Sequence, residues 1–428
     1  MITARAFAGR NYAVYGLARS GLATARALLA SGASVTAWDA REEARARAPG
    51  EIRIADLDQM ELSSFDSLVV TPGLPLNRHP IARRAQNCGL EVIGDIELFA
   101  RARSELEPHK VVGITGTNGK STTTALVHHI LKGAGVPTTM GGNIGLPILA
   151  QDPLPRGGIY VLELSSYQID LTTSLDCDVA VLLNVTPDHL DRYEDFEAYA
   201  ASKARLFEMQ SGEHTKIISR DSKRSSEEYE ARWRTDHHRV LAISSGEIED
   251  QSAWPSLKGP HNAENAAAAV ATCRALGISN EQIESGLRTY PGLPHRMERV
   301  REKGGVLFVN DSKATNPTAT APALAAFDRI RWICGGQAKT DNLDECAPSF
   351  GHVRKAYTIG EAGELFASLL SPHMAVAECE TLERAVGEAA LEAEPGDTVL
   401  LSPACASFDQ FRDFEDRGDQ FRELVEGL

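Results

Sequence analysis

The sequence predicts an α/β protein of three domains, each built around a mainly parallel β-sheet. Apolar strands, turns and amphipathic helices alternate through most of the chain, which is the pattern of parallel sheets covered by helices. Glycine-rich turns stand between a strand and a helix at Gly16–Gly21 and Gly113–Ser121, where such folds bind ligands. The length of 428 residues also exceeds what one ordinary core contains.

Nine apolar segments locate the predicted strands. They are Asn11–Tyr15, Ser34–Trp38, Ser67–Val70, Val111–Thr115, Ile159–Leu164, Val179–Asn184, Val306–Asn310, Ile330–Cys334 and Thr398–Ser402. They fall into three groups along the chain, and the third group follows the loop Tyr290–Pro294, which contains proline and glycine. We therefore expect domains at residues 1–97, 98–294 and 295–428.

The composition argues against several classes of protein. The formal net charge of −15 disfavours non-specific binding of nucleic acid, which needs a basic surface. No segment approaches the roughly 20 apolar residues of a membrane helix, and the N-terminal residues lack the apolar core of a secretory signal. The seven cysteines are scattered without a CxxC pair, as is typical of reduced thiols. We expect a cytoplasmic protein with no membrane or nucleic-acid partner.

The second glycine-rich turn predicts a phosphate-binding loop. The strand Val111–Thr115 runs into Gly116–Ser121, and a helical segment follows. Glycines let backbone N–H groups and the helix N-terminus surround an anion, and Lys120 adds a positive charge. Ile114 occupies the position of the first glycine in the usual P-loop spacing, so this loop is a variant. The alternative is a glycine-rich turn with a surface lysine, which the order of strand, loop and helix disfavours.

Polar residues in two other segments extend this site. Glu163 follows an apolar run and stands at the edge where α/β sheets bind ligands, and its carboxylate oxygens suit Mg²⁺. Asn262 and Asn265 open an alanine-rich helix and share one face of it. The structural alternative to a ligand-binding role is that one of these two asparagines is the N-cap of that helix.

The first glycine-rich turn is close to a dinucleotide-binding fingerprint but lacks its middle glycine. Gly16–Gly21 follows a strand and precedes a helix, and Asp39 ends the next strand. Ala18 stands at the middle glycine position, where a side chain hinders the close approach of a pyrophosphate. A nicotinamide-dependent oxidoreductase is therefore the weaker interpretation of this domain.

Motifs along nearly the whole chain resemble those of the Mur ligases. The loop GITGTNGKSTTT at residues 113–124 also resembles the ATP loop of folylpolyglutamate synthase. The further motifs, in family order, are Gly141–Gly145, Glu163–Gln168, Asn184–Tyr193, Lys203, Gly259–Asn265, His295–Glu298, Asn310–Asn316, Gly335–Lys339 and Leu401–Asp409. The resemblance implies an ATP-dependent ligase that forms peptide bonds and needs ATP and Mg²⁺. It also implies a Rossmann-like N-terminal domain, a central P-loop ATPase-like domain and a Rossmann-like C-terminal domain.

The resemblance assigns individual residues to these tasks. The residues expected to bind ATP are Gly116, Thr117, Asn118, Gly119, Lys120, Ser121, Thr122, Asn262, Asn265, Arg296 and Asp311. The residues expected to bind a UDP-linked substrate are Gly16, Leu17, Ala18, Arg19, Ser20, Asp39, Thr71, Gly73 and Asn143. The residues expected to bind an incoming D-glutamate are His189, Thr315, Lys339, Ser402 and Phe408. The expected catalytic residues are Lys120, Glu163, His189, Lys203 and Lys313. Magnesium is expected on Ser121, Glu163 and His189, with Lys203 contributing indirectly as a carbamate.

Two segments, Tyr15–Gly21 and Ser402–Phe411, resemble the members of the family that add D-glutamate. The substrates that this implies are UDP-N-acetylmuramoyl-L-alanine and D-glutamate, and we expect a monomer. Gln337 departs from the pattern, since some relatives carry a carboxylate there. Taken singly, Phe408 is more typical of a packed core.

Three alternatives remain at this point. They are a Mur ligase for another amino acid, a nucleotide sensor without turnover, and an oxidoreductase. The sensor is disfavoured because five expected reactive residues occur together in the chain, namely Glu163, His189, Lys203, Lys313 and Lys339.

Overall fold

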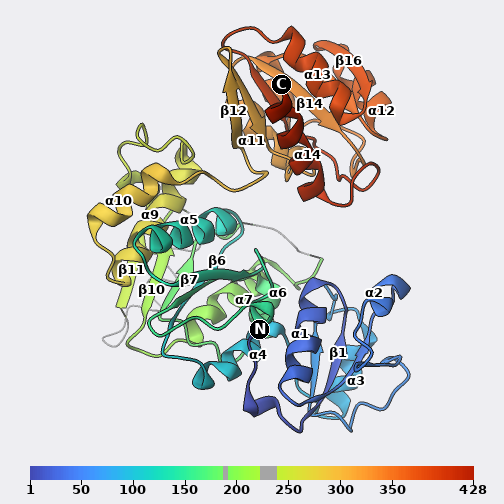
Figure 1. Cartoon of the computed structure of the whole chain (residues 1–428), viewed down its shortest axis with the longest axis vertical. Helices are drawn as coiled ribbons and strands as arrows, with labels where there is room; N and C mark the ends of the chain where they lie inside the picture. Colours follow the sequence, from blue (N-terminus) through green and yellow to red (C-terminus); the bar gives the residue numbers. More distant parts are fainter. Residues whose placement is uncertain (187–190, 222–238) are drawn as a thin grey trace. The chain divides into compact units, whose positions relative to one another are not determined.

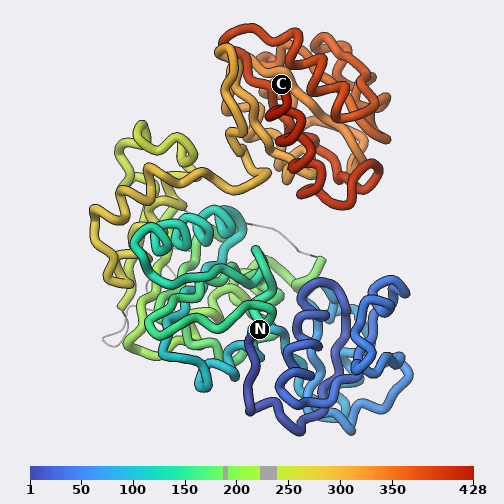
Figure 2. Tube along the Cα trace, in the orientation of Figure 1, coloured from blue at the N-terminus to red at the C-terminus, as the bar shows by residue number. Residues whose placement is uncertain are grey.

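The computed structural model describes residues 1–186, 191–221 and 239–428 (Figure 1). The chain, traced in Figure 2, separates into two compact units, Met1–Tyr290 and Pro291–Leu428. The first unit contains two β-sheets and the second contains one. These helix-covered sheets confirm the predicted α/β class.

Five parallel strands form the first sheet: β1 (Asn11–Tyr15), β2 (Ser34–Trp38), β3 (Arg53–Ile54), β4 (Ser67–Val70) and β5 (Val92–Ile93). The helices here are η1 (Arg5–Phe7), α1 (Arg19–Ala30), α2 (Glu42–Ala46), α3 (Pro80–Asn87), α4 (Asp95–Ala102) and η2 (Arg103–Glu105). The strand order is β3-β2-β1-β4-β5. The strands β2 and β3 are added on one side of β1, and β4 and β5 are added on the other side. Parallel sheets bind ligands at the carboxyl ends of the strands where the strand order switches in this way.

Six parallel strands form the second sheet: β6 (Lys110–Thr115), β7 (Thr138–Gly142), β8 (Ile159–Glu163), β9 (Val179–Leu182), β10 (Thr215–Ser219) and β11 (Arg239–Ile243). The helices here are α5 (Lys120–Gly133), η3 (Ile148–Ala150), α6 (Ser166–Asp170), α7 (Phe196–Glu208), η4 (Ser245–Glu247), α9 (Pro260–Ala275) and α10 (Asn280–Thr289). The strand order is β11-β10-β9-β6-β8-β7. Because β6 lies between β8 and β9, the carboxyl ends of these three strands meet at one edge.

The sheet of the second unit is mixed. Its strands are β12 (Glu298–Lys303), β13 (Val306–Asn310), β14 (Ile330–Gly335), β15 (Val353–Ile359), β16 (Ala375–Glu380) and β17 (Thr398–Leu401), in the order β12-β13-β17-β14-β15-β16. Its helices are α11 (Pro317–Ala325), η5 (Ala347–His352), α12 (Gly363–Leu370), α13 (Leu382–Glu392) and α14 (Phe414–Gly427). Only β12 and β13 pair antiparallel. Gly304 and Gly305, both with positive φ, make their two-residue connection, which forces a hairpin.

All nine predicted strands are present, and their ends differ from the prediction by two residues or fewer. Lys203 lies in the helix α7. The prediction omitted eight of the described strands, namely β3, β5, β7, β10, β11, β12, β15 and β16. Among them, β3 is short and exposed, and β12 is a largely polar edge strand. Another, β10, is fully buried but contains Lys216, and this charged residue interrupts the apolar pattern.

None of the seven cysteines forms a disulfide, and six of them are buried. No helix among the described residues is long and apolar enough to cross a membrane.

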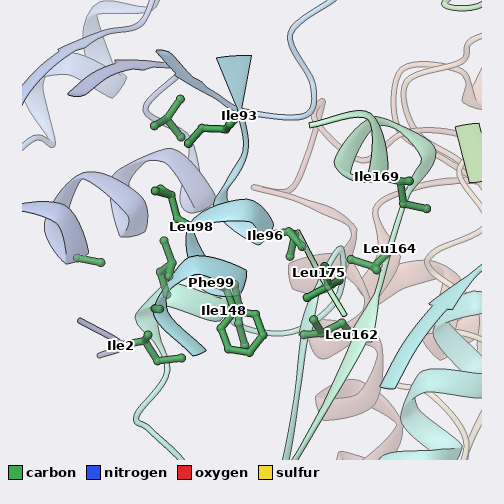
Figure 3. Packing of buried hydrophobic residues seen from close by; sticks show 14 of the residues in the cluster. Ile2, Ile93, Ile96, Leu98, Phe99, Ile148, Leu162, Leu164, Ile169 and Leu175 are labelled. Carbon is green, nitrogen blue, oxygen red and sulfur yellow. The ribbon is translucent and has the colours of Figure 1, made fainter. Parts of the chain in front are cut away.

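A continuous apolar core joins the first two sheets. Phe99 of α4 is fully buried and lies in one cluster with Ile148 and Leu162 of the second sheet's layer (Figure 3). Its ring meets the ring of Tyr160 edge to face, with 5.0 Å between centroids. Ile2 belongs to the same cluster. One core cluster of the unit Met1–Tyr290 therefore spans both sheets, and a separate cluster, which contains Leu68 and Ile81, lies at the first sheet.

We expect Phe99→Ala to destabilise the unit Met1–Tyr290 by about 3–5 kcal/mol, because it leaves a cavity in this shared core. Hydrogen exchange measured by peptide should accelerate throughout residues 1–290 and remain unchanged in residues 291–428. Phe366→Ala, which removes an equally buried ring from α12, is the matched control and should give the reverse pattern. Faster exchange in both units of both variants would show that they unfold together.

Candidate active site

The phosphate loop connects β6 to α5 and depends on its glycines. Gly119 immediately precedes α5 with φ of 82°, and a Cβ at this position would lie 2.2 Å from Oδ1 of Asn265. Gly116 has φ of 153°, and a Cβ there would lie 2.8 Å from the side chain of Leu183. Any other residue would be strained at both positions and would also clash. The loop therefore needs glycine for its conformation and for close packing.

Asn184, just after β9, accepts hydrogen bonds from two backbone N–H groups of the phosphate loop. The N–H of Thr117 donates to the carbonyl oxygen of Asn184 at 2.8 Å, and the N–H of Asn118 donates to its Oδ1 at 2.9 Å. These two donors are therefore turned away from any phosphate. The first turn of α5 remains to receive an anion, since the N–H groups of a first turn lack partners within the helix.

Two lysines converge on this loop. Nζ of Lys120 donates to the carbonyl oxygens of Gly116 and Thr117 at 2.9 and 2.8 Å. Nζ of Lys203, which is only 2% exposed, donates to the same Gly116 oxygen at 2.9 Å and lies 4.5 Å from the ring centre of Tyr199. Two ammonium groups that share one acceptor repel each other. The site therefore favours an anionic ligand, or a change of charge at Lys203.

Glu163, the last residue of β8, presents an unsatisfied carboxylate oxygen. The side chain is 2% exposed, and its Oε1 accepts a hydrogen bond from Nδ2 of Asn143 at 2.8 Å. Its Oε2 is buried and has no hydrogen-bond partner among the described residues. A buried oxygen without a partner is unfavourable, and a hard cation would satisfy it. Ile114 pairs with Glu163 across β6 and β8, so the carboxylate lies on the strand next to the one that feeds the phosphate loop.

Neither Asn262 nor Asn265 is the N-cap of α9, so the structural alternative to a ligand-binding role does not hold. The N-cap is Gly259, with φ of 95°, and Pro260 takes the first helical position; proline suits that position because its missing N–H has no partner there. Asn262 and Asn265 do share a face, since Nδ2 of Asn265 donates to Oδ1 of Asn262 at 3.2 Å. Asn265 also accepts from the Thr123 hydroxyl at 3.2 Å, which ties α9 to α5.

Glu264, between these asparagines, was not predicted to belong to the site. Its Oε2 accepts from Nδ2 of Asn184 at 3.1 Å, which turns Oδ1 of Asn184 toward the phosphate loop. Burial raises the pKa of Glu264. In the sequence it is one charged residue near the start of an alanine-rich helix, a pattern typical of an exposed side chain, so no local signal identified it.

In the first sheet, the Gly16–Gly21 turn packs against the end of β4. A Cβ on Gly16 would lie 2.3 Å from Oγ1 of Thr71, and a Cβ on Gly21 would lie 1.9 Å from the carbonyl oxygen of Gly16. Oδ2 of Asp39 accepts from the N–H of Leu17 at 2.8 Å. The structure therefore brings the expected substrate residues at the ends of β1, β2 and β4 together, with Asp39 supporting the turn.

Two arginines connect this turn region to the second sheet. Nη2 of Arg19 donates to the carbonyl oxygen of Gly145 at 3.0 Å, close in sequence to Asn143. Arg192, which was not predicted, donates to the carbonyl oxygen of Leu74 at 2.8 Å, and its guanidinium lies 4.2 Å from the ring centre of Tyr167. His189 lies outside the described residues.

In the unit Pro291–Leu428, Asp311 is the centre of a buried polar network. Its Oδ1 accepts from the N–H of Met297 at 3.1 Å, and its Oδ2 accepts from the Ser402 hydroxyl at 2.7 Å. Burial raises the pKa of Asp311 from 3.8 to about 7. Ser402 was expected to face an amino acid, but its side chain is fully buried. In this structure it supports Asp311, because its hydroxyl also contacts Thr320 behind it at 3.1 Å.

The other expected residues of this unit are closer to solvent. Nζ of Lys313 lies 3.7 Å from the ring centre of Phe414, and Nζ of Lys339 donates to Oγ1 of Thr315 at 3.4 Å. Phe408 is 68% exposed, so it does not belong to the core, as it would if its role were packing. Arg296 lies at the turn between Leu293 and β12.

Three family models match the chain: the MurD-like N-terminal domain of Mur ligases at residues 10–94, the Mur ligase middle domain at residues 114–249, and the Mur ligase glutamate ligase domain at residues 295–405. A protein named UDP-N-acetylmuramoylalanine–D-glutamate ligase from Novosphingobium aromaticivorans is 61% identical, over 100% of this chain and 97% of its own. One of the same name from Sphingopyxis alaskensis is 59% identical, over 100% of both chains. The chain belongs to the Mur ligase family.

Solved structures share the fold of this Mur ligase at low sequence identity. UDP-N-acetylmuramate-alanine ligase MurC from Thermotoga maritima has a TM-score of 0.61 at 17% identity, over 98% of this chain and 99% of its own. MurF from the same organism, in complex with ADP, has a TM-score of 0.58 at 18% identity, over 98% and 96%. Escherichia coli FolC with ADP has a TM-score of 0.56 at 19% identity, over 83% and 98%.

The raised pKa of Asp311 predicts a pH-dependent stability of this Mur ligase. Because the folded carboxyl binds its proton more tightly than the unfolded one, its stabilising contribution is complete below about pH 4. The contribution is lost as the pH rises through about 7. We expect the free energy of unfolding of the wild type to fall over this range relative to Asp311→Asn, whose side chain stays neutral. Denaturant titrations of both proteins at several pH values check this, and parallel curves would contradict it.

Proposed function

We propose that this Mur ligase joins D-glutamate to UDP-N-acetylmuramoyl-L-alanine, with cleavage of ATP to ADP and phosphate, in the synthesis of peptidoglycan precursors. The observation that carries the proposal is the identity of 55–61% to three relatives named as ligases of this kind, aligned over the whole of this chain. The Mur ligase glutamate ligase domain at residues 295–405 agrees with it.

The proposed reaction has two bond-forming steps. The carboxylate of UDP-N-acetylmuramoyl-L-alanine attacks the γ-phosphorus of ATP, so that an acyl phosphate forms and ADP leaves. The amine of D-glutamate then attacks the acyl carbon, loses a proton and displaces phosphate through a tetrahedral intermediate. ATP thereby replaces a poor leaving group, hydroxide, by phosphate. Phosphoryl transfer of this kind depends on positioning and on neutralisation of charge.

We assign ATP to the phosphate loop of the second sheet. The first turn of α5 and Lys120 would hold its phosphates, since two other loop N–H groups are bound to Asn184. Asn262 and Asn265 would hold the adenine from α9. We assign Arg296, Asp311 and Lys313 to ATP by family resemblance alone. The ADP complexes of MurF and FolC concern proteins of the same fold.

The residues at the carboxyl ends of β6 and β8 also fit a bound Mg²⁺. The unsatisfied Oε2 of Glu163 offers a buried anionic oxygen, and Ser121 offers a hydroxyl in the first turn of α5; both are oxygen ligands of the kind that Mg²⁺ prefers. The metal would neutralise charge on the phosphates and the substrate carboxylate. We assign His189 to a second metal position by family resemblance alone.

We assign the UDP-linked substrate to the turn after β1. Gly16, Leu17, Ala18 and Ser20 would wrap it, with Thr71 and Gly73 beside them and Asp39 bracing the turn through Leu17. Arg19 and Asn143 would connect it to the second sheet. D-glutamate would contact Lys339, Thr315 and Phe408, and Ser402 would act through Asp311. The lysine and hydroxyl donors suit an amino acid with two carboxylates.

We also propose three domains, at residues 1–97, 98–294 and 295–428, in an enzyme that acts as a cytoplasmic monomer. The three sheets support this division, although the first two share a core.

An assay with purified protein tests the proposed function directly. With ATP, Mg²⁺ and UDP-N-acetylmuramoyl-L-alanine, phosphate release should be fastest with D-glutamate, and mass spectrometry should show one added glutamyl residue. L-alanine, L-lysine and meso-diaminopimelate are the competing acceptors. Removal of Mg²⁺ by a chelator should stop the reaction. Preference for another amino acid would reject the assigned acceptor, and no phosphate release with any acceptor would reject ligase activity.

We propose that Lys203 is carbamylated in the active enzyme, because a −1 carbamate relieves its repulsion with Lys120 and can support a cation or its water shell. Lys203→Ala should lose activity by ~100-fold or more, as when one preorganised charge is removed. Short carboxylates in the buffer should restore part of it by replacing the missing anion. Lys120→Ala is the control, since it should be equally inactive and not be rescued. Rescue of both variants, or of neither, would contradict the carbamate.

A further inference from the structure

Arg417 of α14 is a buried cation that makes no ion pair within the part of the chain that the structure describes, although the carboxylate of Asp409 is near enough to raise its pKa. Its side chain is 0% exposed, and it makes no salt bridge among the residues that the structure describes. Arg331 of β14, also mostly buried, instead pairs with Asp397 and Glu392. A buried charge without a counter-charge is unfavourable unless hydrogen bonds solvate it. The burial of the Arg417 charge therefore needs an explanation other than an ion pair, whereas ion pairs explain the burial of Arg331.

The guanidinium of Arg417 is solvated by two loops. Its Nε donates to Oγ of Ser312 at 3.0 Å, and its Nη2 donates to the Ser312 carbonyl oxygen at 2.9 Å. From the other loop, Cys405 offers its carbonyl oxygen to Nη2 at 3.0 Å and Ala406 offers its own to Nη1 at 3.3 Å. The planar fork of arginine can span both loops, which a lysine ammonium cannot do in the same way.

A third loop packs against the same group. A Cβ on Gly336 would lie 3.1 Å from Nη1 of Arg417 and 2.4 Å from the Ala406 carbonyl oxygen. Gln337 next to it exchanges two backbone hydrogen bonds of 2.9 Å with Ala406. Gln337 thus joins these loops through its backbone, so this connection does not depend on the identity of its side chain.

The three loops carry the residues assigned to the amino acid. Thr315 lies three residues after Ser312, Lys339 follows Gln337 by two residues, and Phe408 follows Ala406 by two residues. We propose that Arg417 is a positioning and specificity-determining residue, which holds these loops together and places a buried positive charge beneath the pocket for a dicarboxylate amino acid. Burial lowers its pKa only to about 10, so it stays charged at neutral pH. The inference rests on the proposed function.

The experiment compares KM values for the three substrates. Arg417→Met removes both the positive charge and the guanidinium hydrogen bonds. Arg417→Lys keeps the positive charge but cannot make the same set of hydrogen bonds. We expect the KM for D-glutamate to rise about 10- to 100-fold in Arg417→Met, the range for loss of a hydrogen-bonded charge, and less in Arg417→Lys. The KM for UDP-N-acetylmuramoyl-L-alanine should stay within about twofold, because its assigned loops do not contact Arg417. The KM for ATP should rise less than the KM for D-glutamate, because only the Ser312 loop also carries residues assigned to the nucleotide.

Arg331→Met is the matched control. It removes a mostly buried arginine from the opposite, amino-terminal end of the same sheet, so it should lower thermal stability and leave the KM for D-glutamate unchanged. An unchanged KM for D-glutamate in folded Arg417→Met, or equal rises for all three substrates, would overturn the proposal. If Arg417→Met does not fold, the same comparison is made with Arg417→Lys, whose KM for D-glutamate should rise more than its KM values for the other two substrates. Failure of the wild type to use D-glutamate would instead reject the proposed function.

Discussion

The attachment of the phosphate loop to Asn184 is the constraint on which the nucleotide half of the site depends. It uses one backbone bond and one side-chain bond from adjacent loop residues, so the loop cannot turn without breaking both. Glu264 holds the other end of the same amide, and Asn265 occupies the space that a side chain at Gly119 would need. The loop is thereby shaped before a ligand arrives, which lowers the cost of ordering on binding.

Polar groups left in unfavourable surroundings mark each part of the proposed site. Oε2 of Glu163 is buried and has no hydrogen-bond partner among the described residues, and Lys120 and Lys203 share one carbonyl oxygen. In the second unit, burial holds the pKa of Asp311 near 7, and Arg417 is charged and makes no ion pair with another described residue. Such groups lower the stability of a fold, and they are typical of functional sites because a ligand of the right charge satisfies them.

Several side chains contribute to the proposed site by holding other residues in place. Ser402 is close to the proposed amino-acid pocket in sequence, but its hydroxyl faces Asp311 and Thr320 from behind. Asp39 likewise holds the backbone of Leu17. Arg417, Glu264 and Arg192 each connect segments that are far apart in the chain. A site held in this way keeps its geometry because the supporting side chains are themselves fixed by packing and hydrogen bonds.

The sequence by itself determined the fold class, nine of the strands and the residue types at the strand ends, because apolar periodicity and glycine-rich turns are local signals. It did not reveal the hairpin of β12 and β13, the buried strand β10 with Lys216, or Gly259 as the N-cap of α9. Only the tertiary structure decided which polar residues support the site, as Glu264, Arg192 and Arg417 do, and that Ser402 is buried while Phe408 is exposed. The physical reason is that burial and hydrogen-bond partners depend on long-range packing, which spacing along one segment does not encode.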